Sequence, residues 1–409
     1  MACGTSSEEI GDMGLNILKG SVPFPCAVLK ESALRRNAAW MNEFAKKAQV
    51  MLCPHGKTTM SPELFGRQLA DGAWGITAAT YHQLRVMRSF GIKRIFLANQ
   101  LVDPIAMGFV VDELSADTEF QFYCLVDSIT NIEALGRASK RSVRPIQVLI
   151  ELGQQGGRTG ARAHEDALRL AVAVNSFPNL NLVGLETYEF VVAGSNDTER
   201  ERNIADLFRS FVNLAMELDS RGLLKGPNFV LSAGGSVYFD LAATAITSVR
   251  LSRPVIPIIR SGCYLTHDHG WLPDTYAKMC LRSEIAASIR TCPSPALEIW
   301  SYIQSRPEPT RALAAFGKRD VSHDIHFPEP ILHFRPGNSG LPENFSDGTA
   351  VSALNDQHAY LNVPSASTLQ VGDMLACGIS HPCTTFDKWH AMLLVDDEYN
   401  VTGAISTYF

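Results

Sequence analysis

The sequence predicts an α/β barrel of the (β/α)8 type joined to a C-terminal all-β domain. Eight short apolar runs recur between residues 50 and 262, and amphipathic helical segments lie between them. Strands that alternate with helices are typical of a parallel sheet, and about 250 residues is the usual size of an eightfold barrel. After residue 275 the long helical patterns stop. Short apolar runs then alternate with Pro, Gly, Asn and Asp clusters, which indicates an all-β domain.

The expected barrel strands and helices follow one another along the chain. The strands are residues 50–53, 74–78, 94–98, 120–126, 146–151, 182–186, 229–232 and 257–262. Apolar residues at helical spacing predict helices at residues 62–71, 81–90, 164–175 and 197–221. An open doubly wound sheet is the alternative, but its Gly-rich turn is missing, because Pro-His-Gly-Lys-Thr-Thr follows the first strand.

The all-β domain is expected to take strands from both ends of the chain. Its strand candidates are residues 285–289, 297–303, 312–316, 360–363, 374–379 and 392–395. Residues 25–30 form another strand-like run, ahead of a helix at 32–49, and we expect this run to pair with the C-terminal sheet. The predicted division is an N-terminal segment at 1–30, a barrel at 31–275 and a β-domain at 276–409.

Composition excludes several classes of function. Of the 409 residues, 46% are hydrophobic, and Asp and Glu outnumber Lys and Arg by 42 to 36. This balance gives no general attraction to nucleic acid or to an anionic membrane. We find neither a targeting signal nor an apolar run near the ~20 residues of a membrane helix. Nine scattered cysteines do not resemble a disulfide framework. We therefore expect a cytoplasmic protein that acts on a small molecule.

Lys57 is the first candidate for chemistry. It directly follows the first barrel strand, and barrel enzymes carry their catalytic groups at the C-terminal ends of the strands. Partial desolvation at such a position lowers the pKa of a lysine and makes its amine a nucleophile for aldehydes. The alternative is an ordinary solvated loop lysine.

A glycine-rich loop, Ser-Ala-Gly-Gly-Ser at residues 232–236, follows the seventh strand. Gly234, Gly235 and Ser236 are candidates for binding a phosphate, because glycines let backbone N–H groups approach an anion. Barrels usually bind phosphate after strands seven and eight. A tight turn without a ligand is the alternative. Lys57 and this loop would face the same end of the barrel, which is the combination that an enzyme using pyridoxal 5′-phosphate (PLP) requires.

His381 and Cys383 are candidate metal ligands. Residues i and i+2 of an extended chain point to one side, and imidazole with thiolate suits zinc. Two protein ligands would leave positions open for water or substrate, as in catalytic zinc sites. The alternative is a Pro-containing turn with a half-buried histidine.

Three other polar residues follow barrel strands: Arg158 follows the fifth, Tyr188 the sixth and Tyr264 the eighth. Each could face the same end of the barrel, where a tyrosine hydroxyl could hydrogen-bond a cofactor. A solvated loop cation and buried structural tyrosines are the alternatives.

Two motifs are the most specific. Pro-His-Gly-Lys-Thr at residues 54–58 resembles the PLP-lysine motif of the D-serine dehydratase and D-threonine aldolase group, and His-Pro-Cys-Thr-Thr-Phe-Asp-Lys-Trp at 381–389 resembles the metal motif of that group. The runs at 157–160, 232–236, 260–264 and 317–320 recur in matching order. These are fold-type III PLP enzymes related in architecture to alanine racemase. The resemblance extends from about residue 23 to the C-terminus.

The resemblance implies a PLP barrel joined to a β-domain, in a homodimer with its sites near the subunit interface. It implies that Lys57 binds PLP, with Arg158, Tyr188 and Tyr264 around the cofactor, Gly234, Gly235 and Ser236 at its phosphate, and His381 and Cys383 on Zn²⁺ or another divalent metal. Dehydratase-like members resemble His-x-Cys with zinc. Aldolase-like members more often carry His-x-Asp with a harder ion, which agrees with the preference of thiolate for zinc.

Cys383 favours the dehydratase side. The predicted function is a PLP- and zinc-dependent lyase that eliminates water from a β-hydroxy-D-amino acid such as D-serine, giving a 2-oxo acid and ammonia. The alternative is aldolase chemistry on a D-threonine-like substrate, which gives glycine, or a substituted glycine, and an aldehyde. A racemase has no need of the metal. A binding module with a solvated Lys57 is the non-enzymatic alternative.

Overall fold

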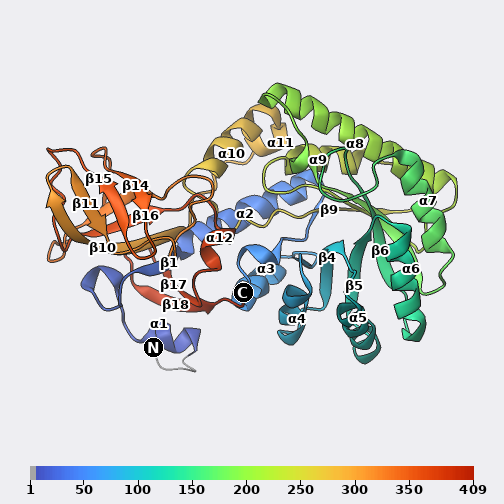
Figure 1. Ribbon diagram of the computed structural model, residues 1–409, viewed down its shortest axis with the longest axis horizontal. Helices are drawn as coiled ribbons and strands as arrows, with labels where there is room; N and C mark the ends of the chain where they lie inside the picture. The colour runs from blue at the N-terminus through green and yellow to red at the C-terminus, as the bar shows by residue number, and fades with distance from the viewer. Residues whose placement is uncertain (1–5) are drawn as a thin grey trace.

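A parallel barrel stands beside a domain of antiparallel sheet in the computed structural model, which describes residues 6–409 (Figure 1). All eight expected barrel strands are present. They are β2 (Met51–Leu52), β3 (Ile76–Ala78), β4 (Arg94–Gln100), β5 (Gln121–Val126), β6 (Ile146–Leu152), β7 (Leu180–Thr187), β8 (Phe229–Ser232) and β9 (Val255–Ile259). Their order is β2-β9-β8-β7-β6-β5-β4-β3, and every neighbouring pair is parallel.

The sheet closes between its first and last strands. His55, just beyond β2, forms a parallel bridge with Thr77 of β3. The N–H of Trp74 also donates a hydrogen bond to the C=O of Leu52 at 2.7 Å. The predicted α/β barrel is therefore confirmed. Side chains from successive strands fill its interior, as the packed core of such barrels requires. This interior cluster is Cys53, Phe96, Leu125, Leu149, Val183, Val230 and Ile258.

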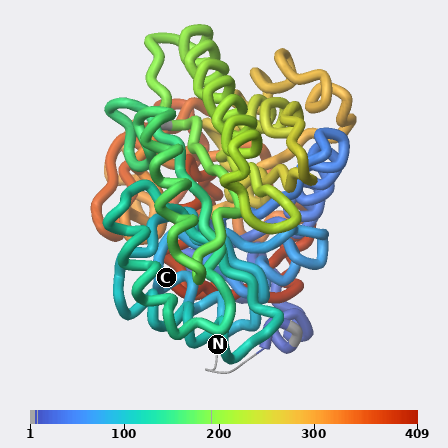
Figure 2. The backbone as a smooth tube through the Cα atoms, turned by 90° about the vertical axis from the view of Figure 1, so that its right-hand side faces the viewer, coloured from blue at the N-terminus to red at the C-terminus, as the bar shows by residue number. Residues whose placement is uncertain are grey.

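Helices surround the barrel. Figure 2 shows the molecule from the side on which the barrel lies. They are α2 (Glu31–Ala48), α3 (Pro62–Ala70), α4 (Tyr81–Ser89), α5 (Pro104–Ala116), α6 (Ile129–Ala138), α7 (His164–Asn175), α8 (Asp197–Ser220), α9 (Phe239–Ser248), α10 (Trp271–Arg282) and α11 (Glu284–Ala287). Side chains cap many of their N-termini. Thr80, for example, accepts from the N–H of Gln83 at the start of α4, and Asn196 accepts from Glu199 at the start of α8.

The second domain is built on one long strand. Its strands are β1 (Cys26–Lys30), β10 (Leu297–Glu308), β11 (Arg311–Ala314), β12 (Glu329–Phe334), β13 (Glu343–Asn344), β14 (Ala350–Leu354), β15 (Ala359–Asn362), β16 (Met374–Gly378), β17 (Ala391–Val395) and β18 (Val401–Ser406). The first half of β10 pairs with β1 and β16, and its second half, after a bulge, pairs with β11. Because β1 also pairs with β17, the sheet takes strands from both ends of the chain. Short helices α1 (Ser7–Asp12) and α12 (Cys383–Phe386) complete this part.

The structure corrects the sequence prediction at several places. Residues 285–289 were expected as a strand, but Glu284–Ala287 form helix α11. The side chain of Ser283 caps the N-terminus of this helix by accepting a hydrogen bond from the N–H of Ala286. A short apolar run does not distinguish the two structures, and the cap favours the helix. Strands β12, β13, β14 and β18 were not predicted. The boundary expected after residue 275 lies inside helix α10, and the division into domains remains a prediction.

Backbone hydrogen bonds join the two parts of the molecule. The N–H of His269, beyond β9, donates to Ile379 beyond β16 at 3.0 Å, and Tyr408 donates to Met60 at 2.9 Å. The first bond ties the loop after β16 to the loop after β9, and the second ties the segment after β18 to the segment that follows the Lys57 turn. In residues 6–409, no helix is long and apolar enough to cross a membrane.

Candidate active site

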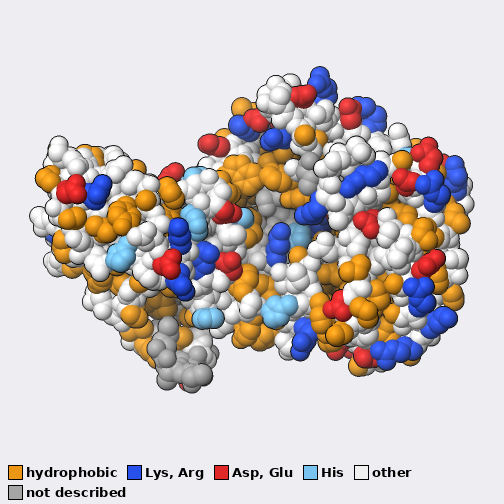
Figure 3. All heavy atoms as spheres, in the orientation of Figure 1, with side chains coloured by type: hydrophobic (Ala, Val, Ile, Leu, Met, Phe, Trp, Pro, Cys, Tyr) orange, Lys and Arg blue, Asp and Glu red, His pale blue; other side chains and the backbone are white. Residues whose placement is uncertain are grey.

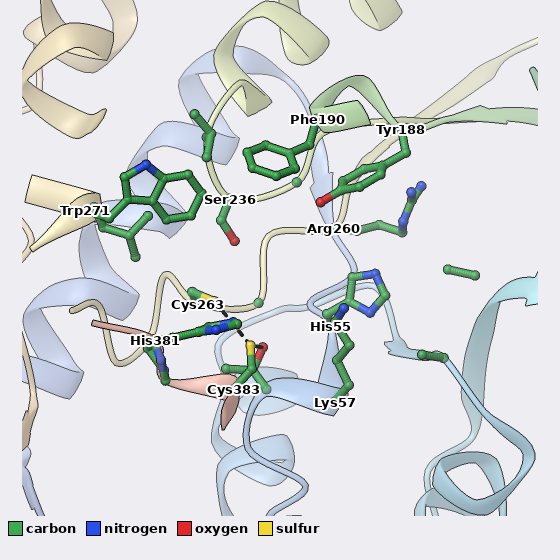
Figure 4. Close-up of a pocket in the computed structure, with 18 of the residues that line it drawn as sticks. His55, Lys57, Tyr188, Phe190, Ser236, Arg260, Cys263, Trp271, His381 and Cys383 are labelled. Carbon is green, nitrogen blue, oxygen red and sulfur yellow. Dashed lines mark hydrogen bonds between the residues drawn. The ribbon is translucent and has the colours of Figure 1, made fainter. Parts of the chain in front are cut away.

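A cavity of about 540 Å³ opens where the C-terminal ends of the barrel strands meet the loop after β16. Most of the predicted site residues line it, namely Lys57, Arg158, Tyr188, Gly235, Ser236, His381 and Cys383. Figure 4 labels five of them, Lys57, Tyr188, Ser236, His381 and Cys383. They come from the loops after β2, β6, β7 and β8, from the segment between β16 and α12, and from the first residue of α12, Cys383. The fold thus brings together residues that lie more than 300 positions apart in the sequence.

Lys57 lies in a tight turn that close packing fixes. The turn is η2 (Gly56–Thr58), and Gly56 has no room for a side chain, because a Cβ there would lie 2.4 Å from the Cε of Met87. Gly262 presses on the same turn from the loop after β9, since a Cβ there would lie 2.6 Å from the Oγ1 of Thr58 and 2.8 Å from the C=O of His55. The Lys57 side chain extends from this turn into the cavity.

A buried ion pair forms part of the cavity floor. Arg260, which follows β9, contacts the carboxylate of Glu186 at the end of β7 and the hydroxyl of Ser232. Both charged side chains are almost completely buried. Burial raises the pKa of Glu186 to about 7, although the charge of Arg260 acts in the opposite direction. Burial also lowers the pKa of His55 well below its usual range, and the nearby charges of Lys57 and Arg260 add to this effect.

Arg158 and Tyr188 form a second pair at the cavity. The guanidinium of Arg158 lies over the ring of Tyr188 at 5.2 Å from its centroid, a cation–π arrangement. Burial raises the pKa of Tyr188 to about 12. Gly235 allows the Tyr188 ring to lie against the glycine-rich loop, because a Cβ there would be 2.9 Å from the ring.

The glycine-rich loop differs from the expected phosphate cradle. The N–H groups of Gly234 and Gly235 donate to the carboxylate of Glu189 at 3.0 and 2.7 Å. Glu189 is buried, and Gly234 does not line the cavity. As the loop stands, these two N–H groups are occupied, and the side chain of Ser236 faces the cavity (Figure 4).

Tyr264 also departs from the expectation. Its side chain is buried in the core, and its hydroxyl accepts a hydrogen bond from the amide of Gln68 at 3.2 Å. It lies outside the cavity, so the alternative of a buried structural tyrosine describes its side chain.

His381 and Cys383 lie side by side, and a second sulfur, that of Cys263, is close by. The Sγ atoms of Cys383 and Cys263 are 3.6 Å apart, and the Nδ1 of His381 lies 2.6 Å from a carboxylate oxygen of Asp324. Hydrogen bonding from Cys263, with His381 beside it, holds the pKa of Cys383 well below its usual range. Hydrogen bonding to Cys383 raises the pKa of His381 to about 9, against the effect of burial, and Asp324 contributes. This pattern favours a thiolate at Cys383.

The residues present fit PLP. Three cavity-lining residues carry buried polar atoms without a hydrogen-bond partner in the described part of the chain, namely Nδ1 of His55, Oε2 of Glu186 and Nε of Arg260. Buried polar groups are normally paired, so these atoms indicate space for a polar ligand. The cavity volume lies within the usual range for small-molecule sites, and a lysine projects into it.

The donor set at His381 and Cys383 is compatible with a metal ion of open coordination. Asp324 holds the Nδ1 of His381, which leaves Nε2 as the ligand atom, a common arrangement for metal-binding histidines. A thiolate beside an imidazole suits zinc. Across residues 6–409, no three His, Cys, Asp or Glu side chains are grouped so that they could hold a metal ion. An ion here would therefore rely on two protein ligands.

Sequence reasoning missed several residues at the site. Glu186 and Arg260 form the buried pair, Cys263 adjoins Cys383, and Phe190 and Trp271 line the cavity. Glu186 could have been found, because a charged residue at the end of an apolar strand is rarely buried without a reason. Cys263 stands in the run at 260–264 that carries part of the resemblance, but only the fold brings its sulfur to Cys383.

Comparison with known proteins matches both parts of the chain. The family model for the alanine racemase N-terminal domain matches residues 29–251, and the model for a putative serine dehydratase domain matches residues 296–395. D-threonine aldolase from Arthrobacter sp. is 24% identical over 92% of this chain and 90% of its own. D-threo-3-hydroxyaspartate dehydratase from Delftia sp. (strain HT23) is 26% identical over 65% of this chain and 66% of its own. The crystal structure of D-threonine aldolase from Filomicrobium marinum superposes with a TM-score of 0.77, at 21% identity, covering 96% of this chain and 97% of that one.

Proposed function

The chain belongs to the alanine racemase N-terminal domain family, and from this membership and the cavity we propose that it is a PLP-dependent lyase of β-hydroxy-D-amino acids. The serine dehydratase domain match and the names of the relatives agree with the resemblance inferred from the motifs, which is confirmed. One observation carries the proposal. Lys57, His381 and Cys383, from opposite parts of the chain, line a single cavity.

The residues of the cavity have separable roles in this proposal. Lys57 would hold PLP through its amine, and the same amine would take the proton from Cα of the substrate, because general base catalysis requires a base at short range. The buried Glu186–Arg260 pair and His55 would offer polar contacts to the cofactor, and Ser236 would offer it the hydroxyl of the glycine-rich loop. Arg158 keeps the Tyr188 ring in place through its cation–π contact. PLP supplies an electron sink for the bond that breaks at Cα.

His381 and Cys383 hold a divalent ion, for which we propose zinc. Asp324 orients the imidazole, and such partners typically strengthen metal binding by 10- to 100-fold. An ion at this position supplies a Lewis acid for the β-hydroxyl of the substrate.

Of the two possible reactions, we propose dehydration to a 2-oxo acid and ammonia. The supporting observation is Cys383, a soft ligand that favours zinc. Retro-aldol cleavage to glycine, or a substituted glycine, and an aldehyde is the second candidate. The named aldolase from Arthrobacter sp., which aligns with nearly the whole chain, favours it. The two reactions differ in which proton leaves first, that of Cα for dehydration and that of the β-hydroxyl for cleavage. A homodimeric, cytoplasmic enzyme remains a prediction.

One assay tests both the function and the choice of reaction. The protein, loaded with PLP and zinc, is incubated with D-serine, D-threonine and D-threo-3-hydroxyaspartate, and 2-oxo acid, aldehyde and glycine are measured separately. Formation of 2-oxo acid with ammonia supports dehydration, and aldehyde with glycine supports the aldolase reaction. A protein that binds PLP but forms none of these products would contradict the proposed lyase.

A further inference from the structure

The candidate active-site cavity has an apolar wall, formed by Phe190, Trp271, Leu272 and Ile325. The rings of Phe190 and Trp271 pack edge to face, with centroids 5.6 Å apart and planes at 72°. Figure 4 shows both rings on the side of the cavity opposite Lys57, and in Figure 3 hydrophobic side chains gather along the upper rim of the hollow between the two parts of the molecule. The two rings are 42% and 36% exposed, so each has a free face.

Local structure holds the apolar wall in place. Trp271 and Leu272 begin helix α10, and the Oδ1 of Asp268 accepts hydrogen bonds from their N–H groups at 2.8 and 3.0 Å. Phe190 lies in the turn η4 (Glu189–Val191) directly after β7. The wall is therefore anchored to the barrel loops that also carry Tyr188 and Arg260.

The positive charges of the cavity are already engaged. Among the lining residues that the structure describes, the only lysine and arginines are Lys57, Arg158 and Arg260. Arg260 is buried against Glu186, Arg158 lies over Tyr188, and the proposed function uses Lys57 for the cofactor and the ion at His381 and Cys383 for the β-hydroxyl. A carboxylate on a substrate side chain that lies against Phe190 and Trp271 would therefore meet apolar surface, and each cation of the lining has another contact or role. Burying a charge in this way is strongly unfavourable.

We propose that the apolar wall selects substrates by their Cβ substituent, favouring 3-hydroxy-D-amino acids with a hydrocarbon and preferably aromatic side chain over those with a second carboxylate. This inference rests on the proposed function and narrows its substrate class. An aromatic substituent gains most, because a phenyl ring has a large apolar surface and packs edge to face with other rings. The substrate named for the Delftia relative, 3-hydroxyaspartate, is in the disfavoured class for this chain.

Competing substrates test the selection directly. The PLP- and zinc-loaded protein is assayed with the D-series of 3-phenylserine, D-threonine and D-threo-3-hydroxyaspartate, and kcat/KM is compared for whichever product forms. We expect phenylserine to exceed 3-hydroxyaspartate by at least about tenfold, the lower range of discrimination by an apolar pocket. Equal turnover, or a preference for 3-hydroxyaspartate, would overturn the inference while leaving the lyase proposal intact.

Two variants locate the selection. Trp271→Ala and Phe190→Ala should each lower the ratio of kcat/KM for phenylserine to that for D-threonine by about tenfold. Phe327→Ala is the matched control, because Phe327 is an exposed aromatic residue near Ile325 that does not line the cavity. Unchanged ratios in both wall variants would overturn the inference.

Binding of unreactive analogues tests the wall without turnover. D-phenylalanine and D-aspartate lack the β-hydroxyl, and their dissociation constants follow from calorimetric titration of the PLP-loaded protein. Tighter binding of D-phenylalanine, weakened in Trp271→Ala, supports the inference even if no lyase activity is found. Equal or reversed affinities would contradict it. If the wall variants instead change the molar mass in light scattering and leave both affinities unchanged, the wall is a contact with a second copy, and the inference is wrong.

Discussion

Lys57 is the residue on which the proposed chemistry depends most directly. Replacing it by alanine removes the amine that binds PLP, and the activity should fall by at least the 10²- to 10⁴-fold typical of general acid–base groups. Borohydride reduction followed by peptide mass spectrometry should place the cofactor on the peptide that contains Lys57 in the unmodified protein and on no peptide in Lys57→Ala. The exposed Lys93, outside the cavity, provides a control substitution. A cofactor that remains attached in Lys57→Ala would identify another lysine and contradict the assignment.

A substitution at Cys383 distinguishes metal binding from cofactor binding. Cys383→Ala should abolish stoichiometric zinc, measured by elemental analysis, while PLP remains bound, because Lys57 belongs to a different segment of the cavity wall. Activity should fall with the metal and should not return when zinc is added. Cys280→Ala, at an exposed cysteine outside the cavity, should keep both zinc and activity. Full zinc content in Cys383→Ala would show that the ion binds elsewhere.

At the scale of single residues, the sequence predicted which positions lie near the site better than it predicted where each side chain points. Lys57, His381 and Cys383 could be found because short local motifs carry them. Tyr264 follows the eighth strand as expected, yet its ring turns into the core and its hydroxyl meets Gln68. The occupation of Gly234 and Gly235 by Glu189 was not predictable, because it depends on how two loops from neighbouring strands meet.

Two glycine replacements contrast packed and open positions within the elements of the barrel. Gly262→Ala places a Cβ against the backbone of His55, so the loop after β9 must move away from the Lys57 turn. We expect a loss of about 1–3 kcal/mol in stability, as for other overpacked sites, together with weaker PLP binding. Gly66→Ala, in helix α3, meets no atom within 4 Å and should instead stabilise the protein by about 0.5–1 kcal/mol. Thermal unfolding and PLP titration measure both effects, and a neutral Gly262→Ala would refute the packing argument.

At the scale of elements, periodicity predicted the barrel well and the second domain only in part. Most barrel strands are largely buried apolar runs that alternate with helices, and helix α7 has the predicted bounds. Strands β12 and β14 mix exposed and buried residues, and β13 has only two residues, both exposed. Pairing with neighbours rather than apolar composition defines such strands, so a single sequence carries a weak signal for them.

At the scale of the whole molecule, the sequence predicted that both ends of the chain meet in one sheet. Strand β1 does lie between β10 and β17. What the sequence could not show is how the loop after β16 reaches the barrel, which depends on contacts such as that of His269 with Ile379. The position of Cys263 beside Cys383, and that of Ile325 in the apolar wall, follow from this docking of the two parts.

Two buried histidines at the junction between barrel and β-sheet domain make its stability depend on pH. Burial lowers the pKa of His267 and of His269 from 6.5 to about 4. The ring of His267 packs edge to face on Tyr276, and that of His269 lies against Gly378, where even a Cβ would be 2.2 Å from the ring. As the folded pKa is the lower one, the unfolded chain takes up protons first when the pH falls. The stabilising contribution is therefore complete above about pH 6.5 and is lost as the pH falls from 6.5 to 4.

His267→Asn tests this origin of the acid sensitivity. Asparagine tolerates the left-handed backbone found at this residue, with φ of 55°, and carries no group that titrates in this range. The variant should be less stable than the unmodified protein at pH 7, because a cavity replaces the ring, but its thermal midpoint should fall less steeply between pH 6.5 and 4. His390→Asn, at an exposed histidine, should keep the original steepness. If His267→Asn loses stability in parallel with the unmodified protein across this range, the acid sensitivity arises outside His267, and His269 or carboxylates paired in the folded state become the alternative source.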